Sequence, residues 1–438
     1  MLRRIVRVTF ISLFIVIVAT FALAGYYYYY LTRLELTDFF LDVSAGVLFL
    51  FLVTLIVRYL LLMFAAFLHH LERMTGPLDT ASRPMVTILA PAYNEGPVIE
   101  ASIESLMALD YPRLEALVID DGSTDDTFEK ASRLAARYGP ERLRVIRKPN
   151  GGKWSALNAG IQQARGELIL CTDADSRLDP GTVREMIKHF DDPKVGAVAG
   201  NVKVANRLSL LTWLQALEYV EGLNLIRMAQ ALLRRVTVIP GPVGMFRKSM
   251  LEEIGGYKDD TYAEDCELTL RIGLAGWDIK YEGKAVAWTE APETSSALFK
   301  QRYRWGRGIL QAIIKHRREL FRPFPKTRDW LLLCSLAFES IALPTMDLLG
   351  VLFFVTAALG GGLSSLVFLW WVQLTVLDMV IAIFCVALEK EDPRLAFLAL
   401  PYRLYFVPLV DCMRFFAWID ELYQVRMGWM RLERVGRI

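Results

Sequence analysis

The chain has 438 residues and nearly balanced charge, with 50 basic and 48 acidic side chains and a formal net charge of +2. Apolar residues make up 54% and charged residues 22%, which is too apolar for an ordinary soluble enzyme and too charged for a bundle of membrane helices alone. Because the sequence lacks an excess of positive charge, nucleic acid is not an expected partner.

Two apolar segments near the N-terminus have the length of membrane helices. Val8–Thr32 carries no charge and ends in a run of tyrosines, and Ala45–Leu68 is interrupted only by Arg58. Basic residues precede the first segment and acidic residues dominate the connection, which places the N-terminus, and the chain after the second segment, in the cytoplasm. An intramembrane arginine is costly, so Arg58 should face protein, headgroups or a polar channel.

Between about Arg83 and Phe324 the pattern becomes that of an α/β domain. Short apolar runs alternate with helical patterns and predict a mostly parallel sheet. The four expected strands are Val86–Ala90, Ala116–Ile119, Leu143–Ile146 and Glu167–Cys171. Ligands of such sheets bind beyond the carboxyl ends of the strands.

Polar and acidic residues follow three of these strands. The first strand runs into Pro91-Ala92-Tyr93-Asn94-Glu95, the second into Asp120-Asp121, and the fourth into Asp173-Ala174-Asp175. Each alone is compatible with a turn and a helix cap, but three at one sheet edge favour a shared site. An Asp-x-Asp suits Mg²⁺ or Mn²⁺, which complete their shells with water and phosphate oxygens. We therefore expect a nucleotide diphosphate as ligand, with the metal neutralising charge on the departing diphosphate.

The segment Asn150–Ser155 superficially resembles a phosphate-binding loop. Arg147 stands where GxxxxGK[ST] requires glycine, and no GxGxxG follows a strand, which argues against an ATPase and against dinucleotide binding. Lys153 remains a candidate point charge for donor phosphate. The five widely spaced cysteines and four histidines form no CxxC or HxxxH pattern, so any metal should be held by oxygen.

Two later motifs each allow a structural and a functional interpretation. Glu264-Asp265 precedes a helical pattern and is either a helix cap or the place of a general base, Asp265, that removes a proton from an acceptor hydroxyl. Gln301-Arg302-Tyr303-Arg304-Trp305 is either part of an amphipathic helix at the bilayer surface or a binding segment. In the second case Arg304 would bind diphosphate and Trp305 would stack against a sugar.

The long helical pattern Leu208–Leu233 inside the domain carries several polar residues. We interpret them as a solvated face; they are Gln215, Glu218, Tyr219 and Glu221. After the basic stretch Lys315–Arg328, three apolar segments follow, at Trp330–Leu359, Leu363–Leu388 and Ala396–Trp418. The last segment contains prolines and charged residues. A full crossing there would leave four arginines outside, against the usual excess of positive charge on the cytoplasmic side, so a re-entrant or interfacial segment is an alternative to a crossing.

The predicted organisation therefore has three parts. Residues 1–75 hold two transmembrane helices, residues 76–324 form a cytoplasmic domain ending in interfacial helices, and residues 325–438 hold two or three transmembrane or interfacial helices. The C-terminal part contains acids within apolar stretches, namely Glu339, Asp347, Asp378 and Asp411. Such acids either line a polar path through the membrane or bond between helices.

These motifs, in this order, resemble those of the processive family 2 glycosyltransferases, which are synthases of cellulose, chitin, hyaluronan and, most closely, bacterial poly-N-acetylglucosamine. The resemblance spans about Val86 to Arg307 with the flanking apolar segments. It rests on the acidic pair, the Asp-x-Asp, the Glu-Asp and the Gln-x-x-Arg-Trp motifs. One departure is Ala263, where threonine is usual. The resemblance implies an inverting transfer by a GT-A-type α/β domain inserted between transmembrane helices.

The resemblance also implies roles for individual residues. The donor would be bound by Pro91, Tyr93, Glu95, Asp121, Lys153, Asp173 and Arg304. Asp173 and Asp175 would hold Mg²⁺ or Mn²⁺. Asp265 with Glu264 would be catalytic, and Gln301 and Trp305 would bind the acceptor. Phe246-Arg247-Lys248, after Gly241-Pro242, is expected to form a loop that faces the acceptor.

The expected function is transfer of a sugar, in the first place N-acetylglucosamine from UDP-N-acetylglucosamine, onto a β-linked polysaccharide that crosses the bacterial inner membrane. The expected partners are the UDP-sugar donor, the polysaccharide acceptor, membrane lipid and, as an option, a small membrane accessory subunit. One alternative is a non-processive transferase that places a single sugar on a polyprenyl phosphate. Another is a transporter or receptor whose cytoplasmic domain only binds nucleotide, although both metal carboxylates and the candidate base argue against it.

Overall fold

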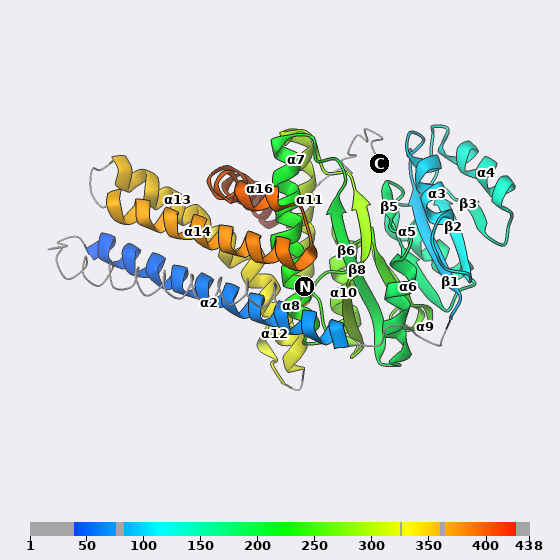
Figure 1. The fold of residues 1–438 in the computed structure, drawn as a ribbon, viewed down its shortest axis with the longest axis horizontal. Coiled ribbons are helices and arrows are strands. Elements are labelled where there is room, and N and C mark those ends of the chain that lie inside the picture. Colours follow the sequence, from blue (N-terminus) through cyan, green and yellow to red (C-terminus); the bar gives the residue numbers. More distant parts are fainter. Residues whose placement is uncertain (1–38, 76–82, 325, 360–363, 426–438) are drawn as a thin grey trace.

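The structure is a computed structural model that describes residues 39–75, 83–324, 326–359 and 364–425. The predicted span Val8–Thr32 and the C-terminal arginines lie outside the described residues. The described chain forms two parts: an α/β domain, and a group of long helices that extends away from one side of it (Figure 1).

One half of the sheet is parallel, as predicted. Strand β1 (Val86–Ala92) lies between β2 (Leu114–Asp120) and β4 (Leu168–Cys171), and β2 also pairs with β3 (Leu143–Arg147). Strands β1, β2 and β4 are buried over nearly all their residues, which is typical of parallel strands covered on both faces. The four strands predicted from the sequence are therefore confirmed.

The other half of the sheet is mixed. Strand β7 (Gly244–Arg247) is antiparallel to β4 and to β6 (Val195–Val204). Strand β8 (Asp278–Thr289) runs parallel to β6 and antiparallel to the short β5 (Ser176–Leu178). The order in this eight-stranded sheet is β3-β2-β1-β4-β7-β6-β8-β5. Only β7 and β5 run against the other six strands, so the sheet is mostly parallel, as predicted, with two antiparallel insertions.

Helices cover the sheet and carry the candidate site at their ends. In the parallel half these are α3 (Ile99–Met107), α4 (Thr127–Tyr138) and α5 (Lys153–Gln163). In the mixed half they are α6 (Thr182–Ile187), α9 (Lys248–Glu253) and α10 (Glu264–Leu274). Helix α5 approaches β1 and β2 closely because Gly160 has no side chain: a Cβ there would lie 2.9 Å from a Leu89 methyl and 3.0 Å from an Ile119 methyl.

A second helical layer separates the sheet from the long apolar helices. The pattern over residues 208–233 forms α7 (Leu210–Glu218), a π-helical turn (Tyr219–Asn224) and α8 (Leu225–Ala231). The prediction that its polar residues form a solvated face is wrong, because the following are all buried: Gln215, Glu218, Tyr219 and Glu221. The cover comes from apolar helices distant in sequence, since α8 packs on α2 and the π-helical turn on α14.

The long apolar helices are α2 (Phe39–Thr75), α13 (Leu343–Leu359) and α14 (Ser364–Glu389), and they extend together from the domain (Figure 1). Helix α12 (Thr327–Ala337) leads into α13 through a π-helical turn. Within the described ranges, four segments are long and apolar enough to cross a membrane: Phe49–Met74, Thr327–Leu352, Trp371–Glu389 and Pro393–Leu422.

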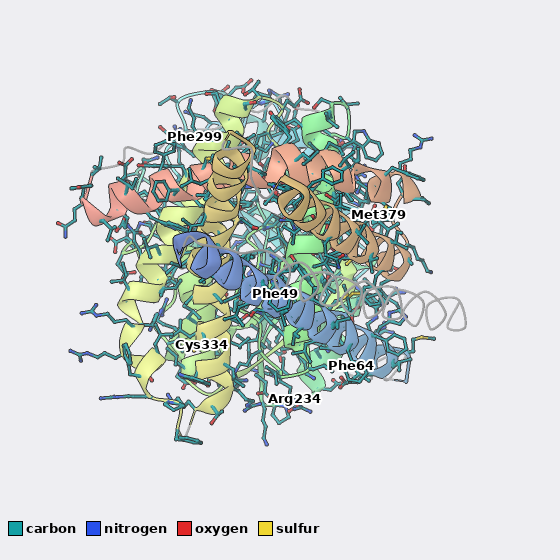
Figure 2. All side chains as sticks on the ribbon, turned by 90° about the vertical axis from the view of Figure 1, so that its left-hand side faces the viewer. Phe49, Phe64, Arg234, Phe299, Cys334 and Met379 are labelled. Carbon is teal, nitrogen blue, oxygen red and sulfur yellow. The ribbon has the colours of Figure 1, made fainter. Side chains whose placement is uncertain are left out.

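The last of these segments is irregular. It consists of a 3-10 turn (Pro393–Leu398), α15 (Ala399–Pro401), a π-helical turn (Tyr402–Phe406) and α16 (Val407–Leu422). Helix α16 runs across the direction of α13 and α14, as Figures 1 and 2 show from two sides. This course favours an interfacial position over a full crossing. The number of crossings remains a prediction.

Helix α16 is fixed to α11 (Ser295–Lys315) by polar contacts. The Tyr303 hydroxyl donates to Asp420 at 2.6 Å, and the Arg307 guanidinium donates to Glu421 at 2.8 Å. The two helices therefore form one layer between the domain and the long apolar helices (Figure 1).

Candidate active site

Lys153, at the first turn of α5, joins two of the predicted acidic motifs. Its ammonium lies 2.6 Å from Oδ1 of Asp173, which follows β4, and 3.6 Å from Oε1 of Glu264, at the start of α10. Burial opposes the charge of Lys153, but the carboxylates of Asp173 and Glu264 outweigh this effect and raise its pKa. Lys153 is therefore a permanent cation between the two motifs.

The loop Pro240–Gly241 closes over this ion pair. A Cβ at Gly241 would lie 2.8 Å from the Lys153 ammonium and 3.3 Å from Oδ2 of Asp173, so only glycine fits without displacing the pair. Sequence reasoning did not assign a role to Gly241 itself, although its place between two prolines marks a constrained loop.

Asp265 lies in the first turn of α10, beside Glu264. The N-cap is Ala263, whose side chain makes no capping bond, so Asp265 does not serve as the cap. Burial and the neighbouring Glu264 raise the pKa of Asp265 to about 6, whereas the charges of Lys153 and Arg304 oppose the increase. Asp265 is thus a carboxylate at neutral pH and a stronger base than an exposed aspartate.

A small cavity brings these groups together. Its polar lining includes Lys153, Glu264 and Asp265. The rest is mostly apolar and comprises Leu157, Cys171, Thr172, Ile239, Pro240, Gly241, Phe246 and Tyr257. Asp173 reaches the cavity through its contact with Lys153. Asp175, two residues further on, is buried, and the Ser176 hydroxyl lies 3.3 Å from its Oδ1.

The predicted acceptor-facing loop at 246–248 is wrong. Residues 244–247 form strand β7 in the middle of the sheet, because Met245 and Phe246 are apolar and fill the space between β4 and β6. Arg247 donates to the carbonyl of Phe190 at 3.1 Å, and Lys248 donates to that of Ala164 at 2.9 Å. Of the three residues in the proposed loop, Phe246 lines the cavity.

Asp121, predicted to contact the donor, organises the loop before α5. Its carboxylate accepts from the amides of Gly151 at 3.1 Å and Gly152 at 2.7 Å, and from the Lys148 ammonium at 2.6 Å. The prediction from sequence missed Lys148, although it follows the third strand as the acidic motifs follow the others. Asp121 therefore positions the backbone that leads into Lys153.

The residues at the end of β1 are partly buried and partly exposed. Pro91 and Glu95 are half-buried and Tyr93 is 42% exposed, so the aromatic ring is available to a ligand. The Glu95 amide donates to the Thr127 hydroxyl at 2.8 Å, which ties this turn to α4.

The Gln-x-x-Arg-Trp motif lies on α11, and its side chains interact with two different regions. The charge of Arg304 acts on Asp265. Buried Arg302 forms an ion pair with Glu218 and donates a hydrogen bond to the Gln301 side chain. Its guanidinium also stacks on the Trp305 ring, and the distance from the Arg302 Cζ to a ring centroid is 4.3 Å. Because much of this helix is buried, α11 is not a simple surface helix.

A second cavity of about 230 Å³ lies between α11, α8 and the long apolar helices. Trp305, Glu218 and Glu221 line it from the domain side. From the apolar helices it is lined by all four of the acids singled out in the sequence, Glu339, Asp347, Asp378 and Asp411, and by Arg58 and Arg403.

These acids line the cavity and pair with arginines, and the pairs of Glu339, Asp347 and Asp378 join different helical segments. That the acids line a path through the membrane stays a prediction. Arg58 binds Glu339, which explains the arginine inside an apolar helix. Arg403 lies 2.5 Å from Asp378 and 3.5 Å from Asp347. Such pairing offsets part of the cost of removing the charges from water.

Residues 84–308, about half of the chain, match the model of the family described as glycosyltransferase like family 2. The chain belongs to this family. Among curated relatives, the poly-beta-1,6-N-acetyl-D-glucosamine synthase of Staphylococcus epidermidis (strain RP62A) is 34% identical over 258 residues, which cover 59% of this chain and 61% of that protein. The synthase of the same name from Staphylococcus aureus (strain COL) is 36% identical over 231 residues, which cover 52% of this chain and 56% of that protein. The match thus spans less than two thirds of either relative.

A solved structure supports the fold of this family 2 member. The mannosyltransferase PcManGT from Pyrobaculum calidifontis, in complex with GDP-Man and Mn²⁺, superposes with a TM-score of 0.61 over 84% of this chain and 98% of that one, at 24% identity. The α/β domain therefore has the GT-A-type fold implied by the sequence motifs.

The contact between α11 and the start of α10 leads to a prediction. A Cβ at Gly308 would lie 2.3 Å from the Ala263 amide nitrogen, so Gly308→Ala must displace the turn that carries Asp265. Misplacement by about 1 Å can reduce a rate about 100-fold, and we expect a loss of this order in sugar transfer, measured with labelled donor. The control is Gly181→Ala, where nothing lies within 4 Å of the new methyl; an equal loss in both variants would contradict the prediction.

Proposed function

We propose that this chain transfers N-acetylglucosamine from UDP-N-acetylglucosamine to a growing β-linked polysaccharide. The observation that carries the proposal is the position of Lys153, which lies between Asp173 and Glu264 and shares a cavity with Asp265. A cation for the leaving diphosphate and a base for the attacking hydroxyl are the two groups that such a transfer requires. The choice of sugar rests on the names of the staphylococcal relatives.

Asp265 acts as the general base. As the acceptor oxygen attacks the anomeric carbon, the bond to the donor phosphate breaks on the opposite face, the hydroxyl proton passes to Asp265, and the configuration inverts. The raised pKa of Asp265 suits this role, because the group is ionised at neutral pH and still accepts a proton readily. Lys153 and Arg304 supply positive charge near the diphosphate.

The residues at the end of β4 fit a hard divalent ion. Asp173 and Asp175 provide carboxylate oxygens, and in the described part of the chain no group of three or more His, Cys, Asp or Glu side chains could hold an ion alone. The donor diphosphate would therefore complete the ligand set around Mg²⁺ or Mn²⁺. When bound, the ion neutralises charge on the departing diphosphate.

The larger cavity gives the product a path. Its lining includes Trp305, whose aromatic face suits stacking against a sugar ring, and its paired acids and arginines offer hydrogen bonds to sugar hydroxyls. We infer that the polymer enters the membrane here, that the catalytic domain is cytoplasmic, and that the protein resides in the bacterial inner membrane. Lipid and, as an option, a small accessory subunit would surround the long helices.

The length of the product separates polymer synthesis from transfer of one sugar to a lipid. With labelled UDP-N-acetylglucosamine and protein in lipid nanodiscs, we expect chains of many sugars, because the cavity lined by Trp305 offers polar side chains to a sugar beyond the one transferred, which a single-transfer enzyme does not need. Products are resolved by gel electrophoresis before and after enzymatic digestion. Lipid carrying a single sugar as the sole product would overturn polymer synthesis, and binding of nucleotide without any transfer would support the receptor alternative.

The base assignment leads to a second prediction. Asp265→Asn keeps the size of the side chain but cannot accept the proton, so we expect transfer to fall about 10²–10⁴-fold with donor affinity nearly unchanged. Transfer is measured by label incorporation and affinity by calorimetry. Asp259→Asn, at an exposed position outside the cavity, is the control and should retain activity. Loss of donor binding in the Asp265 variant would mean that this residue is not the base.

The pKa of Asp265 also predicts a pH dependence. Because burial and Glu264 raise this pKa to about 6, the base becomes protonated at a higher pH than an exposed aspartate would. The value of kcat/KM should therefore fall as the pH drops below about 6, by about tenfold for each further pH unit. A profile that stays flat down to the usual pKa of a carboxyl group would contradict this assignment.

A further inference from the structure

The segment between α11 and α12 exposes two aromatic side chains. A 3-10 turn (Arg317–Phe321) follows α11, and residues 322–324 lead toward α12, where the apolar segment Thr327–Leu352 begins. Phe321 is 83% exposed and Phe324 is 80% exposed. We name residues 317–324 the basic loop.

The arginines of the basic loop differ from the basic residues beside them in their surroundings. Neighbouring basic residues are paired, since Lys315 contacts Asp260 at 2.5 Å and Arg328 contacts Asp278 at 3.5 Å. Over the ranges that the structure describes, by contrast, no carboxylate lies within ion-pair distance of the loop arginines, which are Arg317, Arg318 and Arg322. The loop therefore carries three exposed cations against one acid, Glu319.

The loop is held in place against the first turns of α12. The Trp330 indole N–H donates to the carbonyl of Leu320 at 2.8 Å, and the Thr327 hydroxyl donates to that of Pro323 at 2.9 Å. Helix α12 begins the path into α13, so the loop lies at the level where the long apolar helices meet the domain (Figure 1). The aromatic and basic side chains are thus presented by a fixed backbone.

We propose that the basic loop binds the anionic phospholipids of the inner leaflet, with its arginines on lipid phosphates and Phe321 and Phe324 at the boundary between headgroups and acyl chains. The inference rests on the cytoplasmic placement in the proposed function. Guanidinium groups bind phosphate in bidentate geometry, and basic segments next to a membrane helix are attracted to an anionic surface. Aromatic rings favour this interfacial depth.

A bilayer fits this surface better than a protein partner does. A stable protein interface needs about 800 Å² from each side, which is far more than one short loop offers. Binding to a membrane surface does not require such an area from the loop, because α12 and α13 already hold the loop beside the membrane. Since the basic loop continues α11, its contact with lipid would also fix the orientation of the helix that carries Trp305.

Amide hydrogen exchange of the full-length protein tests this inference without measuring sugar transfer. The protein is placed in phosphatidylcholine nanodiscs with and without phosphatidylglycerol, and exchange is followed in peptides that contain residues 317–324. We expect slower exchange with phosphatidylglycerol. The variant Arg317→Gln/Arg318→Gln/Arg322→Gln should lose this difference, because each basic residue near an anionic surface contributes about fivefold to binding.

The matched control is Arg133→Gln/Arg137→Gln on α4, at the end of the domain away from the long helices (Figure 1). These arginines are similarly exposed, at 73% and 67%, and the control should keep the dependence on phosphatidylglycerol. Phe321→Ser/Phe324→Ser should accelerate exchange in both lipids.

Several outcomes would overturn the inference. Equal exchange of the wild-type protein in both lipids would do so without any variant. Protection by inorganic phosphate in phosphatidylcholine would point to a free anion, and protection that grows with protein concentration would point to a second copy of the chain. Lipid-dependent exchange in a protein that transfers no sugar would refute the proposed function and leave this inference intact.

Discussion

The balance of charge around Lys153 is the constraint on which the rest of the site depends. Asp173, Glu264 and Asp265 come from two separate stretches of chain and approach each other in a space with little water. Like charges in such proximity repel each other, and a cation between them offsets that repulsion. The charge of Lys153 also opposes the rise in the pKa of Asp265 that burial and Glu264 cause. The fold must therefore hold the starts of α5 and α10 within reach of the end of β4.

A second set of charges holds the domain against the long helices. The carboxylate of Glu391, just after α14, lies 2.8 Å from the Lys203 ammonium, and Glu389 accepts from the Asn201 amide at 3.0 Å. Buried ion pairs of this kind contribute little net stability, because removing the charges from water costs about as much as their attraction returns. Their directional bonds instead select one orientation of the domain, and that orientation places Trp305 in the lining of the larger cavity.

The sequence was sufficient to predict the part of this architecture that depends on local patterns. Uninterrupted apolar runs indicated β1 to β4, and the motifs that follow them led to Asp173, Lys153 and Asp265. The two antiparallel strands, β5 and β7, were missed because they have only three and four residues, and their pairing is decided by distant partners. The buried polar residues of α7 and its π-helical turn were misread for a similar reason: the helices that cover them lie more than a hundred residues away along the chain or before the domain begins.

Helix α11 connects the chemistry with the larger cavity. Successive residues of a helix point about 100° apart, so one rigid element can direct Arg304 toward Asp265 and Trp305 toward the cavity. If the chain makes a polymer, each added sugar must move forward by one unit so that the new terminal hydroxyl again faces Asp265. Because Trp305 is adjacent to Arg304, whose charge acts on Asp265, a sugar stacked on Trp305 would lie near the base. In that case, the spacing of the motif would set the register of the growing chain without requiring the sheet or the long helices to move.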